Sequence, residues 1–465
     1  MSGRFDCVIV GSGTSGGVIA YYLTEGGMRC LLLEAGDAYG ADTFPENDMD
    51  GSARMFWGGG LELSTTAEMA FLRARCLGGT SVVNQCLLDR FDEHAWAAWQ
   101  AASGIGFLSG EEMARHYAEV EGRLNIREVP ATHHNRNARL FVEGCEKRGY
   151  RWAPLRRGET DCAIEEGNDC IACLNGCRRD SKQSTLITFI RWAQALGLQV
   201  WPGFQAEHIE PSSDGVRLSG THHGRPQEIC APRVVLAAGA LGNARLLLRS
   251  GFEKRLPSLG KGFYCHPQLM TFAEFDEPVD AHKGAFQACK SDDPRFRKAG
   301  FKLENVFAPP TSVAMLYPGI GARLQAFMLR YRHLASVEVA VQDTVPGRIS
   351  VDARGRLQIA KRLEGEDVRR GKAGLLAVRE ILESVGARTI LHCPMTFGLH
   401  LMGGLAIGQD AQRSAVGGGF NLHGFPNIYA ADSSIFPAAP GINPALTIMA
   451  LSHRASEEIL KGVIE

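Results

Sequence analysis

The sequence lacks the features that mark membrane-spanning and nucleic-acid-binding proteins. Its 465 residues contain no run of the about 18 apolar residues that a transmembrane helix requires. Lysine plus arginine (50) nearly equals aspartate plus glutamate (51), so no basic field points to nucleic acid or to an acidic membrane surface. Internal repeats, low-complexity tracts and flexible linkers are also missing. We therefore expect no nucleic-acid partner and no transmembrane segment.

An export signal and a disulfide framework are missing too. Phe5-Asp-Cys-Val-Ile-Val-Gly leads directly into a strand pattern instead of the apolar core of a signal peptide. The 13 cysteines, an odd number, then fit reduced thiols, and we expect a cytoplasmic protein. The apolar content of 45% is that of an ordinary globular chain, and the length indicates about two or three domains.

What the sequence does contain is a glycine-rich turn after its first strand pattern. The run at 7–10 ends in Gly11-Ser-Gly-Thr-Ser-Gly16, a helical pattern follows, and a second apolar run at 30–33 ends at Glu34. The glycines allow a tight turn and a close approach of the backbone to a pyrophosphate at the helix N-terminus. Glu34 is placed to accept hydrogen bonds from an adenosine ribose. This pattern predicts a dinucleotide site but does not distinguish FAD from NAD.

A second strand pattern favours FAD over NAD. Val234-Val-Leu-Ala-Ala238 is an apolar run that ends in small residues at Gly239-Ala-Leu-Gly. There the backbone is expected to lie close to a bulky cofactor already bound in the first unit.

Together with two C-terminal turns, these motifs resemble the glucose–methanol–choline (GMC) oxidoreductases, which include choline, cholesterol and long-chain alcohol oxidases. The segment from Arg75 to Asn84 is similar to the family's first signature. Residues 238–251 resemble the second, except that Asn243-Ala-Arg stands where the family usually has Ser/Thr-Pro. The active-site turns, His400-Leu-Met-Gly-Gly and Gly-Ile-Asn443-Pro, are nearest to those of the choline and cholesterol oxidases.

The resemblance implies an α/β fold (α+β overall). Its parts are a Rossmann-like FAD-binding domain and a discontinuous substrate domain built on an antiparallel sheet backed by helices. The FAD domain is expected at 1–95, 160–265 and 392–465, a helical lid or outer segment at 96–159, and the substrate domain at 266–391.

FAD is expected to be bound without a covalent link. Some family members tether it through a histidine in the first signature, where this chain has Val82 and Val83. The residues expected to bind the cofactor are Gly11, Gly13, Thr14, Ser15, Gly16, Glu34, Ala35, Arg75, Gly78, Gly79, Ser81, Asn84, Ala238, Gly239, Asp432, Asn443 and Pro444.

The family's chemistry explains why a histidine and an asparagine stand at the two C-terminal turns. Oxidation of an alcohol removes a hydride, which a flavin accepts, and a proton, which needs a base with a pKa near neutrality. An asparagine NH₂ can hold the developing alkoxide without competing for that proton. We predict His400 as the base and Asn443 as the alkoxide-positioning donor. His266 and His392, which have no such partnered context in the sequence, are expected to be structural.

Four cysteines stand close together in the middle of the chain, at Cys162, Cys170, Cys173 and Cys177. Thiols at this density suit zinc or an iron–sulfur cluster, although the spacing is not that of a zinc ribbon. Similar segments occur in long-chain alcohol oxidase-like members of the family, so free structural thiols are an open alternative. No metal is firmly predicted.

Local patterns predict several elements outside the nucleotide site. A helix is expected at 109–124 with Ser109 as its N-cap, and a hairpin turn at 352–355. A second helix is expected to stop at Gly386, and alternating valines at 337–341 predict a half-buried strand.

The substrate is the part that these patterns define least. Many aromatic residues and several methionines between 266 and 395 suit either sheet packing or an adaptable apolar pocket. No clear carboxylate cluster stands out, although Glu304 and Glu338 are candidates to face a cavity. The pattern slightly favours an apolar or amphipathic alcohol over a sugar.

Three functions follow as alternatives. The first is oxidation of an alcohol CH–OH group to an aldehyde or ketone, with oxygen, a quinone or a protein as the electron acceptor. The second is lyase or decarboxylase chemistry on the same scaffold, because fold does not determine function. The third is a flavin/iron–sulfur electron-transfer component.

Overall fold

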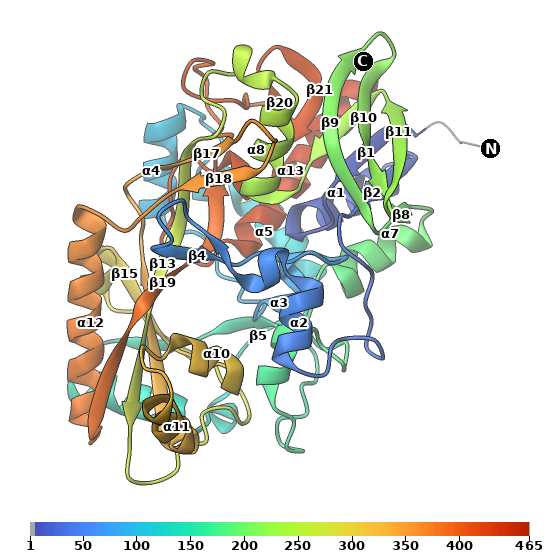
Figure 1. Cartoon of the computed structure of the whole chain (residues 1–465). Coiled ribbons are helices and arrows are strands. Elements are labelled where there is room, and N and C mark those ends of the chain that lie inside the picture. The colour runs from blue at the N-terminus through green and yellow to red at the C-terminus, as the bar shows by residue number, and fades with distance from the viewer. Residues whose placement is uncertain (1–4, 465) are drawn as a thin grey trace.

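Parallel strand pairing around β1 builds the nucleotide-binding half of the molecule (Figure 1). The computed structural model describes residues 5–464, so residues 1–4 and 465 of the expected FAD domain lie outside the described residues. β1 pairs in parallel with β2 and β12, and both of its faces are buried, as is usual for a central parallel strand. In order across this sheet, the strands are β20 (Asn421–Leu422), β21 (Phe425–Ala430), β12 (Arg233–Leu236), β1 (Cys7–Val10), β2 (Cys30–Leu33) and β8 (Gln199–Trp201).

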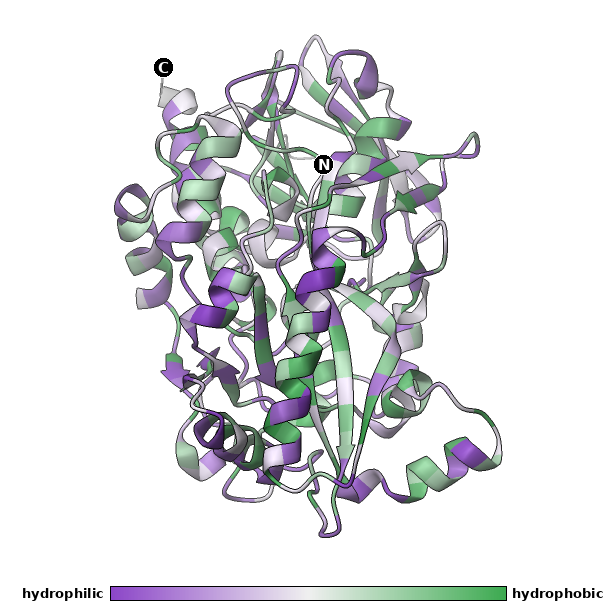
Figure 2. Cartoon of the chain, turned by 90° about the vertical axis from the view of Figure 1, so that its left-hand side faces the viewer, coloured by the Kyte–Doolittle hydropathy of each residue, from purple (hydrophilic) through white to green (hydrophobic). Residues whose placement is uncertain are grey.

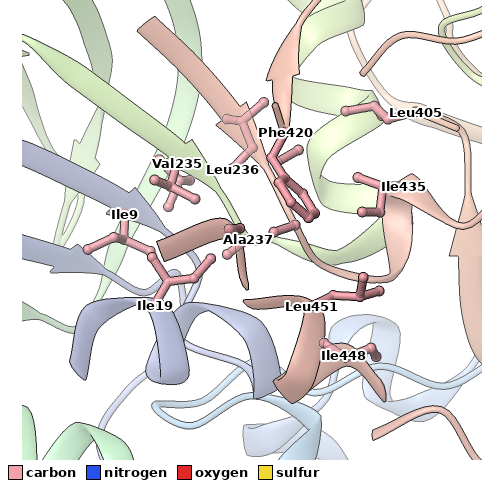
Figure 3. Close-up of a cluster of buried hydrophobic side chains, with 14 of the residues drawn as sticks. Ile9, Ile19, Val235, Leu236, Ala237, Leu405, Phe420, Ile435, Ile448 and Leu451 are labelled. Carbon is pink, nitrogen blue, oxygen red and sulfur yellow. The ribbon is translucent and has the colours of Figure 1, made fainter. Parts of the chain in front are cut away.

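Helices α1 and α13 cover this sheet and pack against each other, and α5 packs on α13. Figure 3 shows part of the core beneath them, where Ile9 and Val235 from the sheet approach Ile19 of α1 and Leu451 of α13 lies nearby. The bounds are α1 (Thr14–Glu25), α5 (Gly110–Gly122) and α13 (Ala445–Ile464). The side chain of Ser109 accepts a hydrogen bond from the Glu112 N–H at 3.2 Å, which confirms the predicted capped helix. None of the helices described is both long and apolar enough to cross a membrane.

A larger, mostly antiparallel sheet of ten strands forms the other half. Its two long central strands, β13 (Lys261–Glu274) and β19 (Thr389–Gly403), lie side by side, and α12 (Glu366–Ser384) packs on one face together with α6 (Arg136–Lys147). Figure 2 turns this side to the viewer and shows α12 running lengthwise in front of the strands. The other strands are β3 (Glu62–Leu63), β4 (Met69–Phe71), β6 (Trp152–Pro154), β14 (Cys289–Ser291), β15 (Phe301–Asn305), β16 (Leu334–Val341), β17 (Gly347–Val351) and β18 (Leu357–Ala360).

The local predictions in this half agree with the structure except at one strand. β17 and β18 form the expected hairpin, and α12 ends just before Gly386. β16 is not half-buried as predicted. Ser336 and Glu338, on the face opposite the valines, are also buried, at 0% and 5% exposure. Helices cover one face of the strand, and the other face turns toward the nucleotide-binding half, so both faces are shielded from water.

The chain crosses between the halves more than once. Within 96–159, α5 packs on α13, α6 packs on α12, and β6 pairs with β14 at the edge of the larger sheet. β3 and β4, from the first segment of the chain, also pair into that sheet. The remaining elements are α2 (Asp48–Met55), α3 (Thr80–Val83), α4 (Glu93–Ser103), α7 (Arg191–Ala195), α8 (Gly239–Arg249), α9 (Pro294–Ala299), α10 (Pro310–Leu316), α11 (Ala322–Leu329), β5 (Ile126–Glu128), β7 (Arg156–Gly158), β9 (Phe204–Ser212), β10 (Gly215–His222) and β11 (Arg225–Ala231).

Trp99 of α4 offers a test of how this core is held together. It is fully buried, its ring meets Phe436 edge-on at 4.4 Å, and its indole N–H donates to the Ala438 carbonyl at 2.9 Å. Trp99→Ala should therefore lower the free energy of unfolding by about 3–5 kcal/mol, measured by urea denaturation. Trp152→Ala, at a half-buried edge strand, is the control and should cost much less. Equal losses in the two variants would contradict this account.

Candidate active site

The glycine-rich turn is packed so tightly that most of its side-chain positions are closed. Gly11 has φ +100°, and a Cβ there or at Gly16 would overlap backbone oxygens, of Ala237 and Gly11 respectively. Gly13 differs, because a Cβ at that position would meet no protein atom within 4 Å. Gly13 is also the residue that precedes α1, so the open space lies at the helix N-terminus, where an anion is favoured.

Ser12 joins this turn to Glu34, a contact that sequence reasoning missed. The Ser12 N–H and hydroxyl donate to Glu34 Oε2 at 3.2 and 2.6 Å, and the Gly36 N–H donates to Oε1 at 2.9 Å. Burial raises the pKa of the Glu34 carboxyl, and these hydrogen bonds oppose that rise. A carboxylate has about four lone-pair sites, so three protein donors leave capacity for a ribose hydroxyl.

The first signature lies directly on this turn. The Gly78 N–H donates to the Ser12 hydroxyl at 2.9 Å, and a Cβ at Gly79 would come within 2.7 Å of Gly13 Cα. The Ser81 hydroxyl donates to the Gly78 carbonyl at 2.6 Å and contacts the hydroxyl of Thr185 at 2.9 Å. Gly78, Gly79 and Ser81 are therefore brought together with Gly13, as the sequence predicts.

Three other residues expected to bind the cofactor, Arg75, Asn84 and Ser15, have side chains that contact other parts of the protein. Arg75 stacks over the Trp57 ring at 4.9 Å, and with Ala35 it lines a 290 Å³ cavity at the end of β2. The Asn84 side chain turns back to accept a hydrogen bond from the Cys86 N–H at 2.9 Å. The Ser15 hydroxyl accepts from Ser452 of α13 at 2.8 Å, which points it toward the neighbouring helix.

Thr14 and Pro444 both stand where a helix begins. Thr14 is the first residue of α1, directly after Gly13. Pro444 precedes α13, and its carbonyl accepts a hydrogen bond from the Ile448 N–H at 2.9 Å. Both positions therefore lie at helix N-termini, where backbone N–H groups are free to meet an anion or a polar ring edge.

Asn243, the departure from the family's second signature, organises the turn after β12. Its carbonyl accepts from the Ala238 N–H at 2.9 Å, and its NH₂ donates to Asp432 Oδ2 at 2.9 Å and to the Ser434 hydroxyl at 3.0 Å. The Gly239 N–H also donates to Asp432, at 2.7 Å. Burial raises the pKa of the Asp432 carboxyl. The only sequence signal for this role was the mismatch itself.

These residues fit FAD by the shape and chemistry of the backbone. Gly13 and Gly239 both face space that a Cβ would enter without meeting protein. Glu34 retains acceptor capacity, and the space beside Gly13 lies at the N-terminus of α1. Gly13, Gly239 and Glu34 are thus the residues that would hold the dinucleotide.

His400 occupies a strained backbone position and contacts a second histidine. Its φ of +52° is uncommon for a residue with a side chain. His400 Nδ1 lies 2.9 Å from His266 Nδ1, and His266 Nε2 accepts from the Gly441 N–H at 3.0 Å. His266 therefore links His400 to the turn that carries Asn443. The sequence predicts His266 to be structural and reveals no partner for it; the partner appears because the register of β13 and β19 brings the two histidines together across 134 residues of sequence. His392, by contrast, bonds to Thr271 away from this turn.

This chain of contacts fixes the protonation pattern of both rings. Because Gly441 donates to His266 Nε2, a neutral His266 carries its proton on Nδ1 and donates it to His400 Nδ1. A neutral His400 then carries its own proton on Nε2. Burial, and then the nearby Lys302 ammonium, lower the pKa of His400 to about 4, and burial likewise holds the pKa of His266 well below its usual range. Both rings are therefore neutral at pH 7.

A buried charged cluster adjoins Asn443. The Asn443 NH₂ donates to Glu304 Oε1 at 3.4 Å, Lys302 forms an ion pair with Glu304 at 2.5 Å, and Gln287 donates to Glu304 Oε2 at 2.7 Å. Glu338 stands opposite Glu304 on the neighbouring strand. Lys302 helps to lower the pKa of Glu304, whereas burial and the Glu304 charge raise that of Glu338, so Glu338 holds a proton. The sequence suggested both carboxylates as cavity residues but not their pairing, which depends on strand register.

The four clustered cysteines lie in one loop beneath α3. All four are free thiols; Cys162, Cys170 and Cys177 are buried, and Cys173 is half-buried. The neighbouring Cys162 and Cys173 thiols, with the Arg157 guanidinium, lower the pKa of Cys170. The loop is thus a second polar cluster, separate from the histidine pair.

Gly13→Ala tests whether the open space at α1 is the cofactor site. The backbone of Gly13 has φ −64°, which alanine adopts readily, and the new methyl group meets no protein atom, so the fold should be unchanged. We expect the purified variant to lose most of its bound flavin, measured by absorbance after denaturation. Gly106→Ala, also in open space, is the control and should keep it. Full flavin occupancy in Gly13→Ala would place the cofactor elsewhere.

Comparison with known proteins shows the family of this chain. Two family models described as GMC oxidoreductase match residues 52–268 and 347–452, and a model of an NAD(P)-binding Rossmann-like domain matches residues 9–65. A GMC-type oxidoreductase of Mycobacterium tuberculosis, itself uncharacterised, is 27% identical over 99% of this chain and 76% of its own length. A long-chain-alcohol oxidase of Arabidopsis thaliana is 25% identical over 99% of this chain and 68% of its own length.

Solved structures share the fold at lower identity. Pyridoxine 4-oxidase from Mesorbium loti superposes with a TM-score of 0.75 at 18% identity, over 98% of this chain and 99% of its own. The two GMC models together span more than half of the sequence and include both signatures, the histidine turn and the asparagine turn. The chain belongs to the GMC oxidoreductases and is an FAD-dependent member of that family.

Proposed function

We propose that this protein oxidises the CH–OH group of an alcohol to an aldehyde or ketone, with His400 as base and Asn443 as the donor that positions the alkoxide. The observation that carries the proposal is the bridge through His266, which joins the His400 strand to the Asn443 turn. A relative named as a long-chain-alcohol oxidase supports the same class of reaction. Non-covalent FAD, when bound, supplies the hydride acceptor.

Asn443 has the hydrogen-bonding capacity that this role needs. One N–H of its side-chain amide points to Glu304 Oε1, which orients the amide, and the second remains for a substrate oxygen. Lys302 keeps Glu304 ionised, and therefore keeps it an acceptor. The charged cluster thus serves to hold the alkoxide donor in one orientation.

The hydrogen bond from Gly441 sets a condition on His400 as the base. While it holds, His400 Nε2 carries a proton and acts as a second donor to the substrate oxygen. His400 accepts a proton at Nε2 only after both rings exchange tautomers, which gives up the bond from Gly441 to His266. The exchange leaves the Gly441 N–H and the His266 Nε2–H directed at each other, and a buried donor left unsatisfied costs about 1–3 kcal/mol. A positioned base contributes about 10²- to 10⁴-fold in rate, or roughly 3–5 kcal/mol. The exchange is therefore compatible with catalysis.

The substrate class also follows from the neighbours of Asn443. Phe272, Phe286 and Phe307 are buried within the core of the larger sheet, which removes them from an apolar pocket. Lys302 and Glu304 lie beside Asn443 instead. We infer an alcohol with a second polar group, which is the amphipathic part of the apolar or amphipathic class that the sequence slightly favoured. Oxygen, a quinone or a protein carrier would reoxidise the flavin.

The lyase alternative has no comparable support. Cleavage of a bond next to a carbonyl or a cyano group does not require a hydride acceptor beside an oriented donor pair. His266 links His400 to the turn that carries Asn443, and this pairing of a base candidate with a donor candidate supports the oxidation.

His400→Ala tests the assignment of the base. The rate of flavin reduction by alcohol, measured anaerobically by loss of the oxidised-flavin band, should fall about 10²- to 10⁴-fold with flavin still bound. The alcohols tested should include aliphatic, aromatic, amino and sugar alcohols. His392→Ala, on the same strand but hydrogen-bonded to Thr271, is the matched control, and its flavin should be reduced at the wild-type rate. An unchanged rate of flavin reduction in His400→Ala would show that His400 is not the base. If no alcohol bleaches the flavin of the wild-type protein, the proposed alcohol oxidation is wrong.

Replacing the Lys302–Glu304 ion pair with neutral side chains tests whether these charges set the pKa of His400. Lys302 lowers the pKa of His400 more than Glu304 raises it, so Lys302→Met combined with Glu304→Gln should raise that pKa from about 4. Because the base must be neutral, the acid limb of the kcat/KM profile should move to higher pH. The control Lys298→Met, at an exposed position, should leave the profile in place. A shift of the acid limb to lower pH would show that Lys302 does not act on His400.

A further inference from the structure

The cysteine loop carries features that alcohol oxidation does not use. Its two ends are held together by the backbone: Glu159 and Lys182 form an isolated antiparallel β-bridge, and the Thr160 N–H donates to the Ser181 carbonyl at 3.0 Å. Between these ends, four free thiols turn inward within sixteen residues, at Cys162, Cys170, Cys173 and Cys177. Cys162 and Cys170 belong to the core of the larger sheet, so packing explains their burial but not why a thiol stands at all four positions.

The spacing and geometry distinguish between two kinds of metal site. Cys170-x₂-Cys173-x₃-Cys177 repeats part of the spacing of bacterial iron–sulfur motifs. Tetrahedral zinc, with Zn–S bonds of about 2.3 Å, would bring every pair of sulfurs to roughly 4 Å. Cys170 is adjacent to both Cys162 and Cys173, and Cys173 is adjacent to Cys177. Over residues 5–464, however, no three of these sulfurs lie all within 4.8 Å of one another, so the thiols form a line of neighbours and not the compact set that a single zinc ion requires. A polynuclear cluster keeps its ligands farther apart, because each binds a different iron.

Two buried cations face the thiols. Arg157, 3% exposed, directs Nη1 and Nη2 at Cys170 Sγ over 3.7 and 3.8 Å. Lys182, 4% exposed, donates to the Cys173 carbonyl at 2.7 Å and has no carboxylate partner within the described part of the chain. A buried ammonium without an anion is strongly unfavourable. Arg157 already forms an ion pair with the buried Glu159 carboxylate at 3.2 Å, so Lys182 is the cation that the described residues leave without an anion. A cluster bound by four thiolates is anionic, so it would neutralise Lys182.

Lys182 also connects this loop to the flavin-binding segment. Its ammonium donates to the Val82 and Asn84 carbonyls at 2.6 and 2.8 Å, at the end of α3 in the first signature. The short helix at Cys170–Asn175 packs against α3 as well. The thiols therefore lie directly behind the residues that line the cofactor.

We propose that Cys162, Cys170, Cys173 and Cys177 bind an iron–sulfur cluster that serves as an electron outlet from the flavin site. Two electrons taken from an alcohol would leave one at a time through the cluster to a quinone, which takes up two protons as it is reduced to the quinol. The outlet role rests on the proposed alcohol oxidation, whereas the cluster itself does not.

The test is the metal content of the full-length protein, purified without oxygen from iron-replete cells. We expect about two to four iron atoms per chain with matching acid-labile sulfide, and a signal in electron paramagnetic resonance after dithionite reduction. Cys170→Ser combined with Cys173→Ser should lose the iron, the sulfide and the signal. Cys393→Ser, a buried thiol outside the loop, should keep all three.

Each outcome decides the proposal. Stoichiometric zinc without iron, or wild-type protein with four reactive thiols and no metal, would overturn it, and neither result depends on how the variants fold. If the protein contains iron but no alcohol bleaches the flavin, the cluster is supported and the proposed oxidation is wrong. If an alcohol bleaches the flavin but the protein contains no iron, the oxidation is supported and the cluster is wrong.

Discussion

The close approach of three backbone segments at Gly11 is the constraint on which the rest of this structure depends. β1, the start of α1 and the end of β12 meet there so closely that a side chain at Gly11 or Gly16 would overlap a carbonyl oxygen. Ser12, between them, bonds to Glu34 and receives the Gly78 N–H. This one turn therefore positions both Glu34, at the end of β2, and the first signature. The end of β12, through Asn243, positions Asp432. A single crowded point thus sets the geometry of the whole cofactor site.

Local signals in the sequence were enough for the elements and the nucleotide turn. The glycine spacing, the Ser109 cap and the β17–β18 hairpin depend on neighbours a few residues away, and all of them formed as predicted. The pairing of His266 with His400 and of Glu304 with Glu338 depends on the register of strands distant in the chain, which no local pattern reports. The same holds for β16, whose second face is buried by an element that its own sequence does not reveal.

The site combines groups that are costly to bury. His266, Glu304 and Glu338 are buried, whereas His400 and Lys302 are half-buried, and each is tolerated because a neighbouring group supplies its partner. Such networks are stable only when nearly every donor and acceptor is matched, which makes their geometry specific. This explains how a small set of contacts can select one tautomer of His400 and one orientation of Asn443.

β13 and β19 give the molecule a continuous spine. Phe263 and Met402, at one end of the pair, belong to the core under the nucleotide-binding sheet, whereas Phe272 and Cys393 belong to the core of the larger sheet. β13 alone has 14 residues, a span of roughly 45 Å at about 3.3 Å per residue. The ladder between β13 and β19 shifts register between Tyr264 and His266 and again between Leu269 and Thr271, and the histidine pair stands at the first of these irregularities. Irregularities of this kind bend a paired strand, so the place where the two halves can flex relative to each other coincides with the two histidines.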